Sequence, residues 1–335
     1  MRHKMVQKII QDYDALQELL SKSGRILFIH GQSSGRFTRL NAILSSISSH
    51  VTHFTDYTPN PKLEDAEEAA RIPCEVILSA GGGSAIDVAK YAKLKNEHAR
   101  LIVIPTTAGS GSEATRFAVI YDAGKKLSLT DDRMIPEYVM FDPELLRFMP
   151  EYVRKSSALD AMSHALEAFW SVKANPESLK YSHEALSTIT RMLENYPVSY
   201  DYEAMQRSAY IAGKAINISQ TTAGHAMSYK LTGIFGISHG HATALCNRVL
   251  FPYLVSHTEL EVLRDIANSM NCDSPEQAAK KYERIVSGMS IEVPCADETQ
   301  IKELVSSVNP ERLKNFPLKL DESMIRELYC GILRK

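Results

Sequence analysis

The chain has 335 residues, which is long enough for two domains of ordinary size. Hydrophobic residues make up 44% of it and charged residues 23%, a composition that excludes disordered, collagen-like and coiled-coil proteins. The 38 Lys and Arg residues are balanced by 40 Asp and Glu residues, so there is no basic excess with which to bind nucleic acid or an anionic membrane surface.

The cysteines and the apolar runs indicate the compartment in which the protein works. Its five cysteines are odd in number and never form a Cys-x-x-Cys pair, which favours free thiols in a reducing compartment. The longest apolar runs, such as residues 26–29, are far shorter than the roughly 20 residues of a membrane-spanning helix. Residues 1–23 are charged and helix-periodic, which is not typical of a signal peptide. We therefore expect a cytoplasmic protein without a membrane partner.

The first part of the chain, from residue 25 to about residue 142, alternates short apolar runs with helical stretches. Such an alternation predicts βαβ units, in which a parallel sheet is covered by helices on both faces. The runs that predict strands are residues 25–30, 51–55, 75–80, 101–105 and 138–143, and the helical stretches between them are residues 36–47, 62–71 and 84–95. Two further β-type runs, residues 116–122 and 125–131, flank Ala123-Gly124 and predict a hairpin.

The second part of the chain has a different pattern. After Met149-Pro150, helical periodicity continues to Lys335 with almost no β-type runs. Proline-containing breaks, such as Phe251-Pro252, divide this part into six to eight predicted helices. We therefore expect an α/β domain over residues 1–150 and an all-helical domain over residues 151–335.

Three consecutive glycines and a serine, Gly81, Gly82, Gly83 and Ser84, follow one predicted strand and precede a helix. Glycines let the backbone approach a diphosphate closely, and the N–H groups and dipole of the next helix favour negative charge. The motif is not the G-x-G-x-x-G dinucleotide fingerprint. It predicts a phosphate-binding turn, with a plain helix-capping turn as the alternative.

A second loop of small residues, residues 105–113, follows the next predicted strand. The carboxyl ends of parallel strands meet at one edge of a sheet, where the ligands of open α/β folds bind. A flexible polar loop is the alternative interpretation of this segment taken alone. Two such loops after neighbouring strands favour a single nucleotide site.

One carboxylate and three imidazoles in the second part of the chain form a candidate metal site. Asp160 and His164 are four residues apart in a predicted helix, so both project from one face about one turn apart. His225 begins another helical stretch, and His239 lies in a predicted turn. This donor set fits Fe²⁺ or Zn²⁺ and suits Mg²⁺ or Ca²⁺ badly. For Asp160 and His164 the alternative is a solvated side-chain pair without a metal.

These motifs resemble those of the iron-containing (group III) alcohol dehydrogenase family, in the same order and over nearly the whole chain. The matching stretches are GGGSAID, VIPTTAGSGSEAT, LDAMSHALEAFWS and GHAMSYKLTGIFGISHGHA. The resemblance implies a dehydroquinate synthase-like architecture, in which a Rossmann-like dinucleotide-binding domain precedes a helical catalytic domain that binds the metal. The residues it implies are Asp160, His164, His225 and His239 for the metal, Gly81, Gly82, Gly83 and Ser84 for the cofactor diphosphate, and Asp87, Thr106, Thr107, Ser110 and Lys126 for further cofactor contacts.

The chain departs from the family pattern at two positions that carry chemistry. Many members have a histidine thought to relay a proton four residues after the third metal ligand, and here that residue is Tyr229. Relatives that prefer NAD often have an aspartate after the first strand, where this chain reads Ile29-His30-Gly31-Gln32. Without a carboxylate that repels a 2′-phosphate, we expect NADPH to be tolerated or preferred. The helical part is also shorter than is usual in the family.

The sequence of the helical part is most similar to the sequences of the subgroup that reduces phosphonoacetaldehyde. An anionic substrate needs cations near the metal. The basic residues that lie next to motif residues in the sequence are Arg116, Lys214, Lys230 and Arg248. The alternative role of each is a surface charge.

The sequence therefore predicts a homodimeric, metal-dependent enzyme that reduces a small aldehyde to its alcohol with NADH or NADPH. The expected metal is Fe²⁺ or Zn²⁺, and an anionic aldehyde, phosphonoacetaldehyde, is the candidate substrate. The expected catalytic residues are Asp160, His164, His225, His239 and Tyr229. The alternatives are a sugar-phosphate cyclase similar to 3-dehydroquinate synthase, a glycerol or glycerol-1-phosphate dehydrogenase, and a non-catalytic binding protein.

Overall fold

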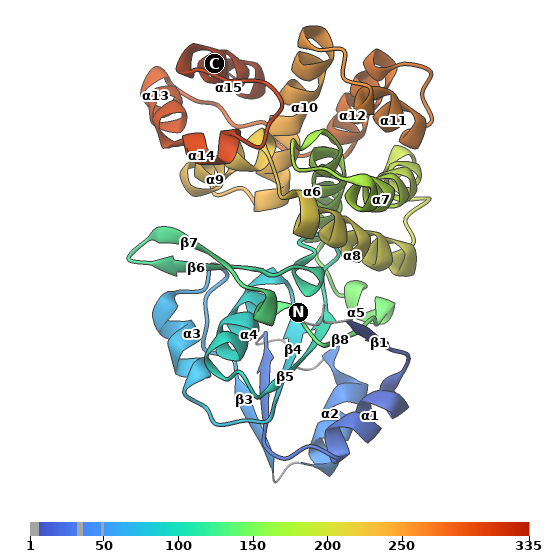
Figure 1. The fold of residues 1–335 in the computed structure, drawn as a ribbon, viewed down its shortest axis with the longest axis vertical. Helices are drawn as coiled ribbons and strands as arrows, with labels where there is room; N and C mark the ends of the chain where they lie inside the picture. Colours follow the sequence, from blue (N-terminus) through green and yellow to red (C-terminus); the bar gives the residue numbers. More distant parts are fainter. Residues whose placement is uncertain (1–6, 32–35, 48–49, 335) are drawn as a thin grey trace. The chain divides into compact units, whose positions relative to one another are not determined.

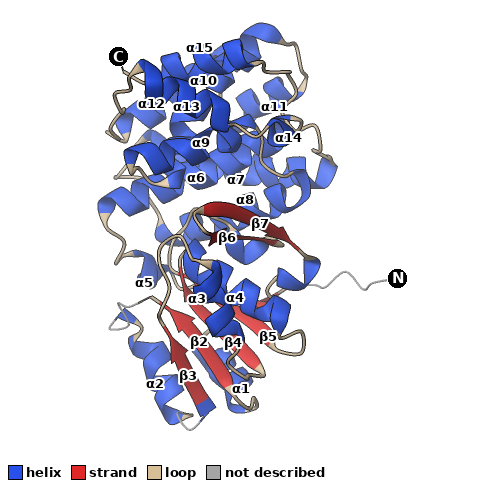
Figure 2. Cartoon of the chain, turned by 90° about the vertical axis from the view of Figure 1, so that its left-hand side faces the viewer, coloured by secondary structure: helices blue, strands red, loops and turns tan. Residues whose placement is uncertain are grey.

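A parallel sheet organises the first part of the chain (Figures 1 and 2). It has six strands as far as the structure describes it. The computed structural model describes residues 7–31, 36–47 and 50–334, and the chain divides into two compact units, Met1–Met149 and Pro150–Lys335. In their spatial order, the strands of the sheet are β1 (Lys8–Ile10), β8 (Tyr138–Met140), β5 (Arg100–Pro105), β4 (Val76–Gly81), β2 (Ile26–His30) and β3 (Val51–Phe54). The strand order reverses between β2 and β4, which is the point where ligands of open α/β sheets bind.

Helices cover both faces of this sheet because successive strand residues alternate between the faces. One face carries α1 (Tyr13–Ser21) and α2 (Thr38–Ser46), and the other carries α3 (Leu63–Ala70) and α4 (Gly83–Lys95). Phe28 is buried in one cluster with residues of α1 and α2, whereas its neighbour Leu27 is buried in a second cluster with residues of α3 and α4. Each such side chain contributes about 1.5–3 kcal/mol by leaving water, so the loops at the strand ends start from a rigid frame.

A two-stranded antiparallel hairpin follows β5, as the sequence predicts. Its strands are β6 (Phe117–Asp122) and β7 (Lys125–Thr130), and the turn between them places Ala123 and Gly124 at positive φ. Three short helical segments flank the hairpin and β8: η3 (Ser112–Ala114), η4 (Asp132–Met134) and α5 (Pro143–Leu146).

The start of the chain differs from the helical pattern expected over residues 1–23. Lys8–Ile10 forms the strand β1, which pairs in parallel with β8, and α1 begins only at Tyr13. The side chain of Asp12 caps α1 by accepting a hydrogen bond of 2.8 Å from a backbone N–H of the first turn. A strand of three residues is too short to show a period of two, so local pattern could not separate it from the helix that follows. Residues 1–6 of this stretch lie outside the described residues.

The second unit consists of helices packed around α6. Its described residues form α6 (Glu151–Trp170), α7 (Pro176–Glu194), α8 (Tyr202–Ser219), α9 (Ala223–Phe235), α10 (His239–His257), α11 (Val262–Ser269), α12 (Pro275–Gly288), α13 (Glu298–Ser307), α14 (Pro310–Leu313) and α15 (Glu322–Ile332). α7, α8 and α10 surround α6, and every residue from Ala158 to Trp170 is buried. A helix buried on all sides brings each of its polar side chains into the interior.

Ten helices are more than the six to eight expected, because short segments such as α14 are helical too. Pro252 does not end a helix, since α10 continues through it to His257. Proline removes one N–H donor, but its neighbours Phe251 and Leu254 are buried and hold the helix in place. The predicted fold class, an α/β unit with a parallel sheet followed by an all-helical unit, is confirmed. Among the described helices, none combines the length and the apolar character needed to cross a lipid bilayer.

Candidate metal centre and nucleotide-binding loops

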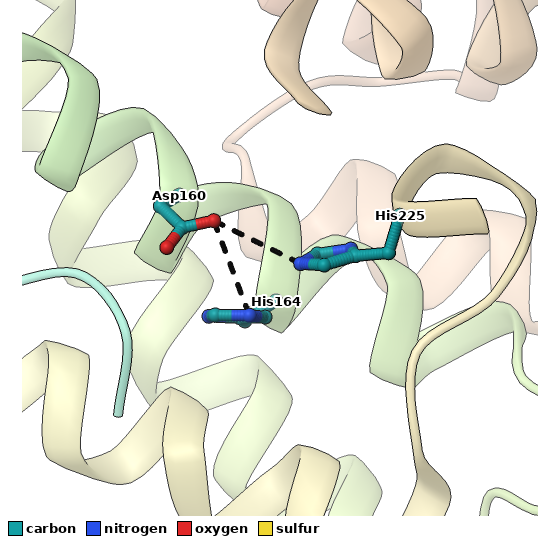
Figure 3. Close-up of side chains that lie close together, drawn as sticks. All are labelled: Asp160, His164 and His225. Carbon is teal, nitrogen blue, oxygen red and sulfur yellow. Dashed lines mark ion pairs between the residues drawn. The ribbon is translucent and has the colours of Figure 1, made fainter. Parts of the chain in front are cut away.

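Asp160, His164 and His225 converge in the interior of the second unit (Figure 3). Asp160 and His164 lie on successive turns of α6, and His225 lies in the first turn of α9. Oδ1 of Asp160 is 4.0 Å from Nε2 of His164 and 3.8 Å from Nε2 of His225, and the two imidazole rings stack with their centroids 4.6 Å apart. The exposed fractions of the three residues are 7%, 5% and 3% in chain order, so water has little access to them.

The spacing of these donor atoms fits a shared metal ion better than a hydrogen-bonded cluster. Distances of 3.8 and 4.0 Å are too long for hydrogen bonds, and Oδ1 of Asp160 and Nε2 of His225 are buried without a hydrogen-bond partner among the described residues. A buried polar atom left in this state costs about 1–3 kcal/mol. Two ligand atoms that bind one ion at about 2.0–2.2 Å lie about 3.3–4.4 Å apart, depending on the angle between them. Two imidazoles and a carboxylate with this spacing fit Fe²⁺ or Zn²⁺.

A fully buried carboxylate behind the cluster orients His225. Oε1 of Glu167 lies 2.6 Å from Nδ1 of His225, and an ionised carboxylate only accepts hydrogen bonds, so the imidazole carries its proton on Nδ1. Nε2 then directs its lone pair towards Asp160, as metal binding requires. Burial alone would raise the pKa of Glu167, but His225 and the hydrogen bonds from Thr222 and Asn247 outweigh it and lower that pKa to about 2.

Other side chains hold Glu167 in this position. Its Oε2 accepts hydrogen bonds from the N–H and the hydroxyl of Thr222, at 2.6 and 2.7 Å, and its Oε1 accepts one from Nδ2 of Asn247 at 3.0 Å. Nε1 of Trp170 donates in turn to the hydroxyl of Thr222 at 2.9 Å. Glu167 is not among the residues predicted from the sequence. A signal was present, because it follows His164 by three residues in an otherwise apolar stretch of the same helix.

His239, the fourth predicted ligand, lies beside the cluster. The donor atoms that lie within 4.8 Å of one another belong to the other three residues. His239 is the first residue of α10, its ring centroid is 5.2 Å from that of His225, and its Nδ1 lies 3.4 Å from the hydroxyl of Ser228. The ring of Tyr229 stacks on the His239 ring with centroids 5.5 Å apart and planes 6° apart. The structure therefore brings three predicted ligands together and places the fourth in ring contact with one of them.

Gly240 allows the start of α10 to approach α6 closely. A Cβ atom added at Gly240 would lie 2.1 Å from the carbonyl oxygen of Ser156 and 2.6 Å from Cβ of Asp160. The first of these contacts is with backbone, which cannot turn aside, so only glycine fits without a shift of one helix. This close approach places Gly240, the residue after His239, beside Asp160 on α6.

Lys230, one of the basic residues predicted to bind an anionic substrate, is directed away from His225. It lies five positions after His225 on α9, which is about 140° around the helix. Its Nζ pairs with a carboxylate oxygen of Glu303 on α13 at 2.7 Å. Its position favours an ion pair between two helices.

Lys214 and Arg116, the other predicted substrate residues, also contact neighbouring side chains. Nζ of Lys214 lies 4.3 Å from the ring centroid of Tyr181, which is a cation–π contact between α8 and α7. Arg116, in the first unit, pairs with Asp132 at 3.1 Å. The ring of Tyr181 thus partly covers the ammonium group of Lys214, and the carboxylate of Asp132 balances the charge of Arg116.

In the first unit, the two loops predicted to bind the nucleotide lie against each other. A Cβ atom added at Gly82 would be 3.2 Å from the side chain of Thr107, and one added at Gly83 would be 3.3 Å from Ser110. The loops after β4 and β5 therefore form one continuous surface of backbone and small hydroxyl groups.

Among the described residues, no capping side chain accepts from the first N–H groups of the helix that follows the glycines. α4 starts at Gly83, and its N-cap residue, Gly82, has no side chain with which to accept a hydrogen bond from the first turn. The loop after β5 is joined to this point by a hydrogen bond of 2.9 Å from the N–H of Thr106 to the carbonyl of Gly81. The free N–H groups and the positive end of the helix dipole suit a phosphate group.

Two of the other residues predicted to contact the cofactor make hydrogen bonds to the protein. Asp87 is half-buried and accepts from the hydroxyl of Ser112 at 2.8 Å and from the N–H of Val119 at 3.1 Å, which ties α4 to η3 and β6. The hydroxyl of Ser84 donates to a backbone carbonyl in the segment before α3. Lys126, on β7, lies near enough to Asp87 to lower its pKa.

A buried lysine follows Asp87 on α4 and lies between two carboxylates. Nζ of Lys90 donates to the hydroxyl of Thr115 at 3.1 Å and to the carbonyl of Phe117 at 2.7 Å. Burial lowers the pKa of Lys90 to about 8, although the charges of Asp87 and Glu113 oppose this shift. Burial likewise raises the pKa of Glu113 to about 7 and that of Asp87 to about 6, against the effect of Lys90. Of these three charged residues only Asp87 was expected from the sequence, as a cofactor contact; Lys90 and Glu113 were not.

The end of β2 lies where NAD-preferring relatives often carry an aspartate. His30 is the last residue of β2. Its Nε2 lies 3.0 Å from Nδ1 of His53, and burial lowers the pKa of His30. A Cβ atom added at the next residue, Gly31, would meet no atom of the described part of the chain within 4 Å. Gln32 lies outside the described residues.

Comparison with known protein families identifies both units. The profile of "iron-containing alcohol dehydrogenase" matches residues 7–143, and the profile of "Fe-containing alcohol dehydrogenase family, C-terminal" matches residues 155–319. This chain belongs to the iron-containing alcohol dehydrogenase family. The family predicted from the motifs is confirmed, and its members are enzymes of the oxidoreductase class.

Two relatives of known name are similar in sequence. The phosphonoacetaldehyde reductase of Streptomyces viridochromogenes is 32% identical over 222 residues, which cover 57% of this chain and 56% of that protein. Long-chain-alcohol dehydrogenase 1 of Geobacillus thermodenitrificans is 28% identical over 327 residues, which cover 84% of this chain and 81% of that protein. The match to the Streptomyces protein thus spans little more than half of its length.

A solved structure has the same fold. The sulfoacetaldehyde reductase of Bifidobacterium kashiwanohense, crystallised in complex with NAD⁺, superposes with a TM-score of 0.87. The two proteins are 24% identical, and the superposition covers 96% of each chain. At this identity the likeness establishes the fold alone.

Proposed function

We propose that this protein is a metal-dependent reductase that converts a small aldehyde into its alcohol with a reduced nicotinamide cofactor. The observation that carries the proposal is the buried cluster of Asp160, His164 and His225, whose donor atoms have metal-ligand spacing in a member of the iron-containing alcohol dehydrogenase family. The names of two similar proteins, phosphonoacetaldehyde reductase and sulfoacetaldehyde reductase, support an aldehyde that carries an acidic group as the substrate.

We propose Fe²⁺ as the metal, with Asp160, His164, His225 and His239 as the residues that hold it. One carboxylate and neutral imidazoles are a donor set that suits Fe²⁺ and Zn²⁺. His239 would complete the set from the start of α10, where its ring already contacts that of His225. When bound, a divalent ion supplies Lewis acidity, which withdraws electrons from a carbonyl group and makes its carbon a better hydride acceptor.

The protein holds the side chains of the proposed metal site in fixed positions. Glu167 holds His225 in the tautomer that presents Nε2 to Asp160, so the imidazole does not have to turn or exchange a proton before it binds. Burial of Asp160, His164 and His225 excludes water and strengthens every electrostatic interaction among them.

We propose that the diphosphate of the cofactor binds at the start of α4, to Gly81, Gly82, Gly83 and Ser84. The open N–H groups of the first turn favour this position. The proposed further contacts are Asp87, Thr106, Thr107, Ser110 and Lys126. NAD⁺ in the crystal structure of the Bifidobacterium protein supports a nicotinamide dinucleotide as the ligand. Because Ile29, His30 and Gly31 offer no carboxylate, we propose that NADPH is tolerated or preferred.

Reduction of an aldehyde also needs a proton for the oxygen atom, and we propose that Tyr229 provides it. Its ring lies one helical turn after His225 and stacks on His239, so its hydroxyl belongs to the same group of side chains. Tyr229→Phe keeps the ring and removes the hydroxyl, so kcat should fall for every aldehyde. Unchanged turnover in this variant would assign Tyr229 to packing only.

The test of the proposed function is cofactor oxidation by purified protein. Fe²⁺-loaded and Zn²⁺-loaded samples are given NADH or NADPH together with phosphonoacetaldehyde, sulfoacetaldehyde or propionaldehyde. The proposal predicts net loss of the absorbance of the reduced nicotinamide when aldehyde is present. Absence of cofactor oxidation with every aldehyde and both metals would contradict it.

The cytoplasmic location and the homodimer stay predictions from the sequence. Size-exclusion chromatography with light scattering measures the second of them. A mass of about one chain would contradict the homodimer.

A further inference from the structure

A tyrosine at the start of α6 holds the beginning of α10. The hydroxyl of Tyr152, in the first turn of α6, accepts a hydrogen bond of 2.9 Å from the N–H of Ser238, the residue directly before α10. The same hydroxyl lies 3.0 Å from Nδ1 of His241, in the first turn of α10. Residues on both sides of His239, the fourth predicted metal ligand, are thus bonded to one side chain.

The second nitrogen of His241 fixes the direction of its contact with Tyr152. Nε2 of His241 lies 2.7 Å from the backbone carbonyl of Glu292, in the segment after α12. A carbonyl oxygen only accepts hydrogen bonds, and burial of His241 favours the neutral imidazole, so Nε2 carries the proton and Nδ1 accepts. Tyr152 therefore donates to His241 while it accepts from Ser238.

The start of α10 follows α6 from Tyr152 towards the metal centre. Asp160 comes eight residues after Tyr152, about two turns along α6, with Ser156 halfway between them. Gly240 packs on this stretch, because a Cβ atom added there would lie 2.1 Å from the carbonyl oxygen of Ser156 and 2.6 Å from Cβ of Asp160. His239 lies in the chain between these contacts, so its backbone has a fixed place beside α6.

The hydroxyl of Tyr152 connects the three helices that carry the proposed metal ligands. α6 carries Asp160 and His164, α9 carries His225, and α10 carries His239. Only residues 236–238 join α9 to α10. A hydrogen bond from α6 to the last residue of this turn limits how far α10 can move relative to the other two helices.

We propose that Tyr152 is a positioning residue of the metal centre, which holds His239 where it can bind the same ion as the other three predicted ligands. This inference rests on the proposed metal site. Tyr152 acts in this account only through the backbone of α10 and takes no part in hydride transfer. Loss of its hydroxyl should therefore weaken metal binding and change the coordination of the ion without removing a ligand.

Tyr152→Phe tests this role because it removes the hydroxyl and keeps the ring. Tyr152 is 44% exposed, so the substitution opens no cavity in the core. Co²⁺ is the probe, since it accepts the same donor atoms as Fe²⁺ and Zn²⁺ and its visible absorption reports the geometry of its ligands. We expect the Kd for Co²⁺, measured by competition with a chelator, to rise about 3- to 10-fold. The absorption spectrum should move towards that of Co²⁺-loaded His239→Ala.

The matched control is Tyr196→Phe. It removes another hydroxyl that is bonded to α6, where it accepts a hydrogen bond of 2.8 Å from Nε of Arg154. Both the Kd and the spectrum of Co²⁺ should stay as in wild type. A role of Tyr152 in stability alone would lower the melting temperature of Tyr152→Phe and leave its Co²⁺ spectrum unchanged.

The spectrum decides between the outcomes. A shift towards the spectrum of His239→Ala supports the proposal, whether the Kd rises or stays the same, because it shows that the ligands have moved. A wild-type spectrum in Tyr152→Phe, or an equal shift in Tyr196→Phe, would overturn the role of Tyr152 and leave the proposed metal site intact. Wild-type protein that binds no Co²⁺ would instead overturn the metal site itself, and the role of Tyr152 with it.

Discussion

Nδ1 of His225 donates a hydrogen bond of 2.6 Å to Oε1 of Glu167, and this contact decides which nitrogen of His225 faces Asp160. The carboxylate cannot donate, so the proton stays on Nδ1 and the lone pair of Nε2 is directed at the centre of the cluster. Thr222 and Asn247 hold Glu167 in turn through hydrogen bonds of 2.6–3.0 Å. The metal-binding form of the imidazole is thus set by a residue outside the proposed ligand set.

Glu167→Gln should weaken Fe²⁺ binding by about 10- to 100-fold, which is the usual effect of removing the partner of a ligating histidine. The amide cannot hold the proton of His225 as strongly as the carboxylate does. Competition with a chelator under anaerobic conditions measures the change in Kd. Glu203→Gln, an exposed substitution on α8, is the control. Equal affinity in the two variants would show that the hydrogen bond does not orient His225.

Gly240→Ala should destabilise the second unit and displace His239. The added Cβ would lie 2.1 Å from the carbonyl oxygen of Ser156, and relieving such an overlap costs about 1–3 kcal/mol. We expect a lower melting temperature and weaker metal binding. At the control position, Gly288, an added Cβ meets no atom within 4 Å, and alanine there should be neutral or stabilise by up to about 1 kcal/mol. The same melting temperature in both variants would contradict the close approach of α10 to α6.

The stability of the first unit should fall as the pH rises from about 4.5 to about 7. Burial raises the pKa of Glu113 to about 7 in the folded protein, whereas the ordinary value is 4.5. Within this window the folded state keeps a proton that the unfolded state has released, so a rising pH favours unfolding, by on the order of 3 kcal/mol in total. Asp87, whose pKa burial raises to about 6, acts in the same direction.

Glu113→Gln tests this dependence because glutamine does not ionise. The fall in melting temperature between pH 4.5 and pH 7 should become smaller than in wild type, and Asp87 should contribute to the fall that remains. Glu68→Gln, at an exposed position of α3, should keep the wild-type slope. A full wild-type slope in Glu113→Gln would mean that Glu113 ionises normally in the folded protein.

A carboxylate at the end of β2 should move the cofactor preference towards NADH. Gly31→Asp places a carboxylate directly after β2, where it would repel a 2′-phosphate and accept a hydrogen bond from a ribose 2′-hydroxyl. A Cβ atom added there meets no atom of the described residues within 4 Å. We expect the ratio of kcat/KM for NADPH to that for NADH to fall by about 10-fold or more. Gly31→Asn, which has the same shape without the charge, is the matched control. A ratio that stays constant in both variants would place the ribose elsewhere.

Most of the first unit follows from local sequence patterns, and the exceptions have physical causes. Short apolar runs that end in glycine or proline predict β4 and β5, because buried parallel strands are apolar on both faces. β1 does not follow, since three residues carry too little periodicity. Pro252 lies within α10 because burial of its neighbours outweighs the loss of one hydrogen bond, and this balance depends on tertiary contacts.

The candidate site is predictable where spacing along one helix decides it. The interval of four residues puts Asp160 and His164 on one face of α6. The approach of His225 depends on how α9 packs against α6, and the resemblance to a family, not local pattern, leads to it. Ser238 follows Tyr152 by 86 residues, so no spacing rule links the two. Contacts of this kind need the three-dimensional structure.

The claim that Asp160, His164 and His225 hold one metal ion is tested most directly by metal analysis. Wild-type protein loaded anaerobically with Fe²⁺ should retain about one ion per chain after desalting, whereas Asp160→Asn, His164→Ala and His225→Ala should each retain almost none. His183→Ala, which removes a histidine that contacts the hydroxyl of Ser269, should behave as wild type. Full retention of iron by the three cluster variants would contradict the account.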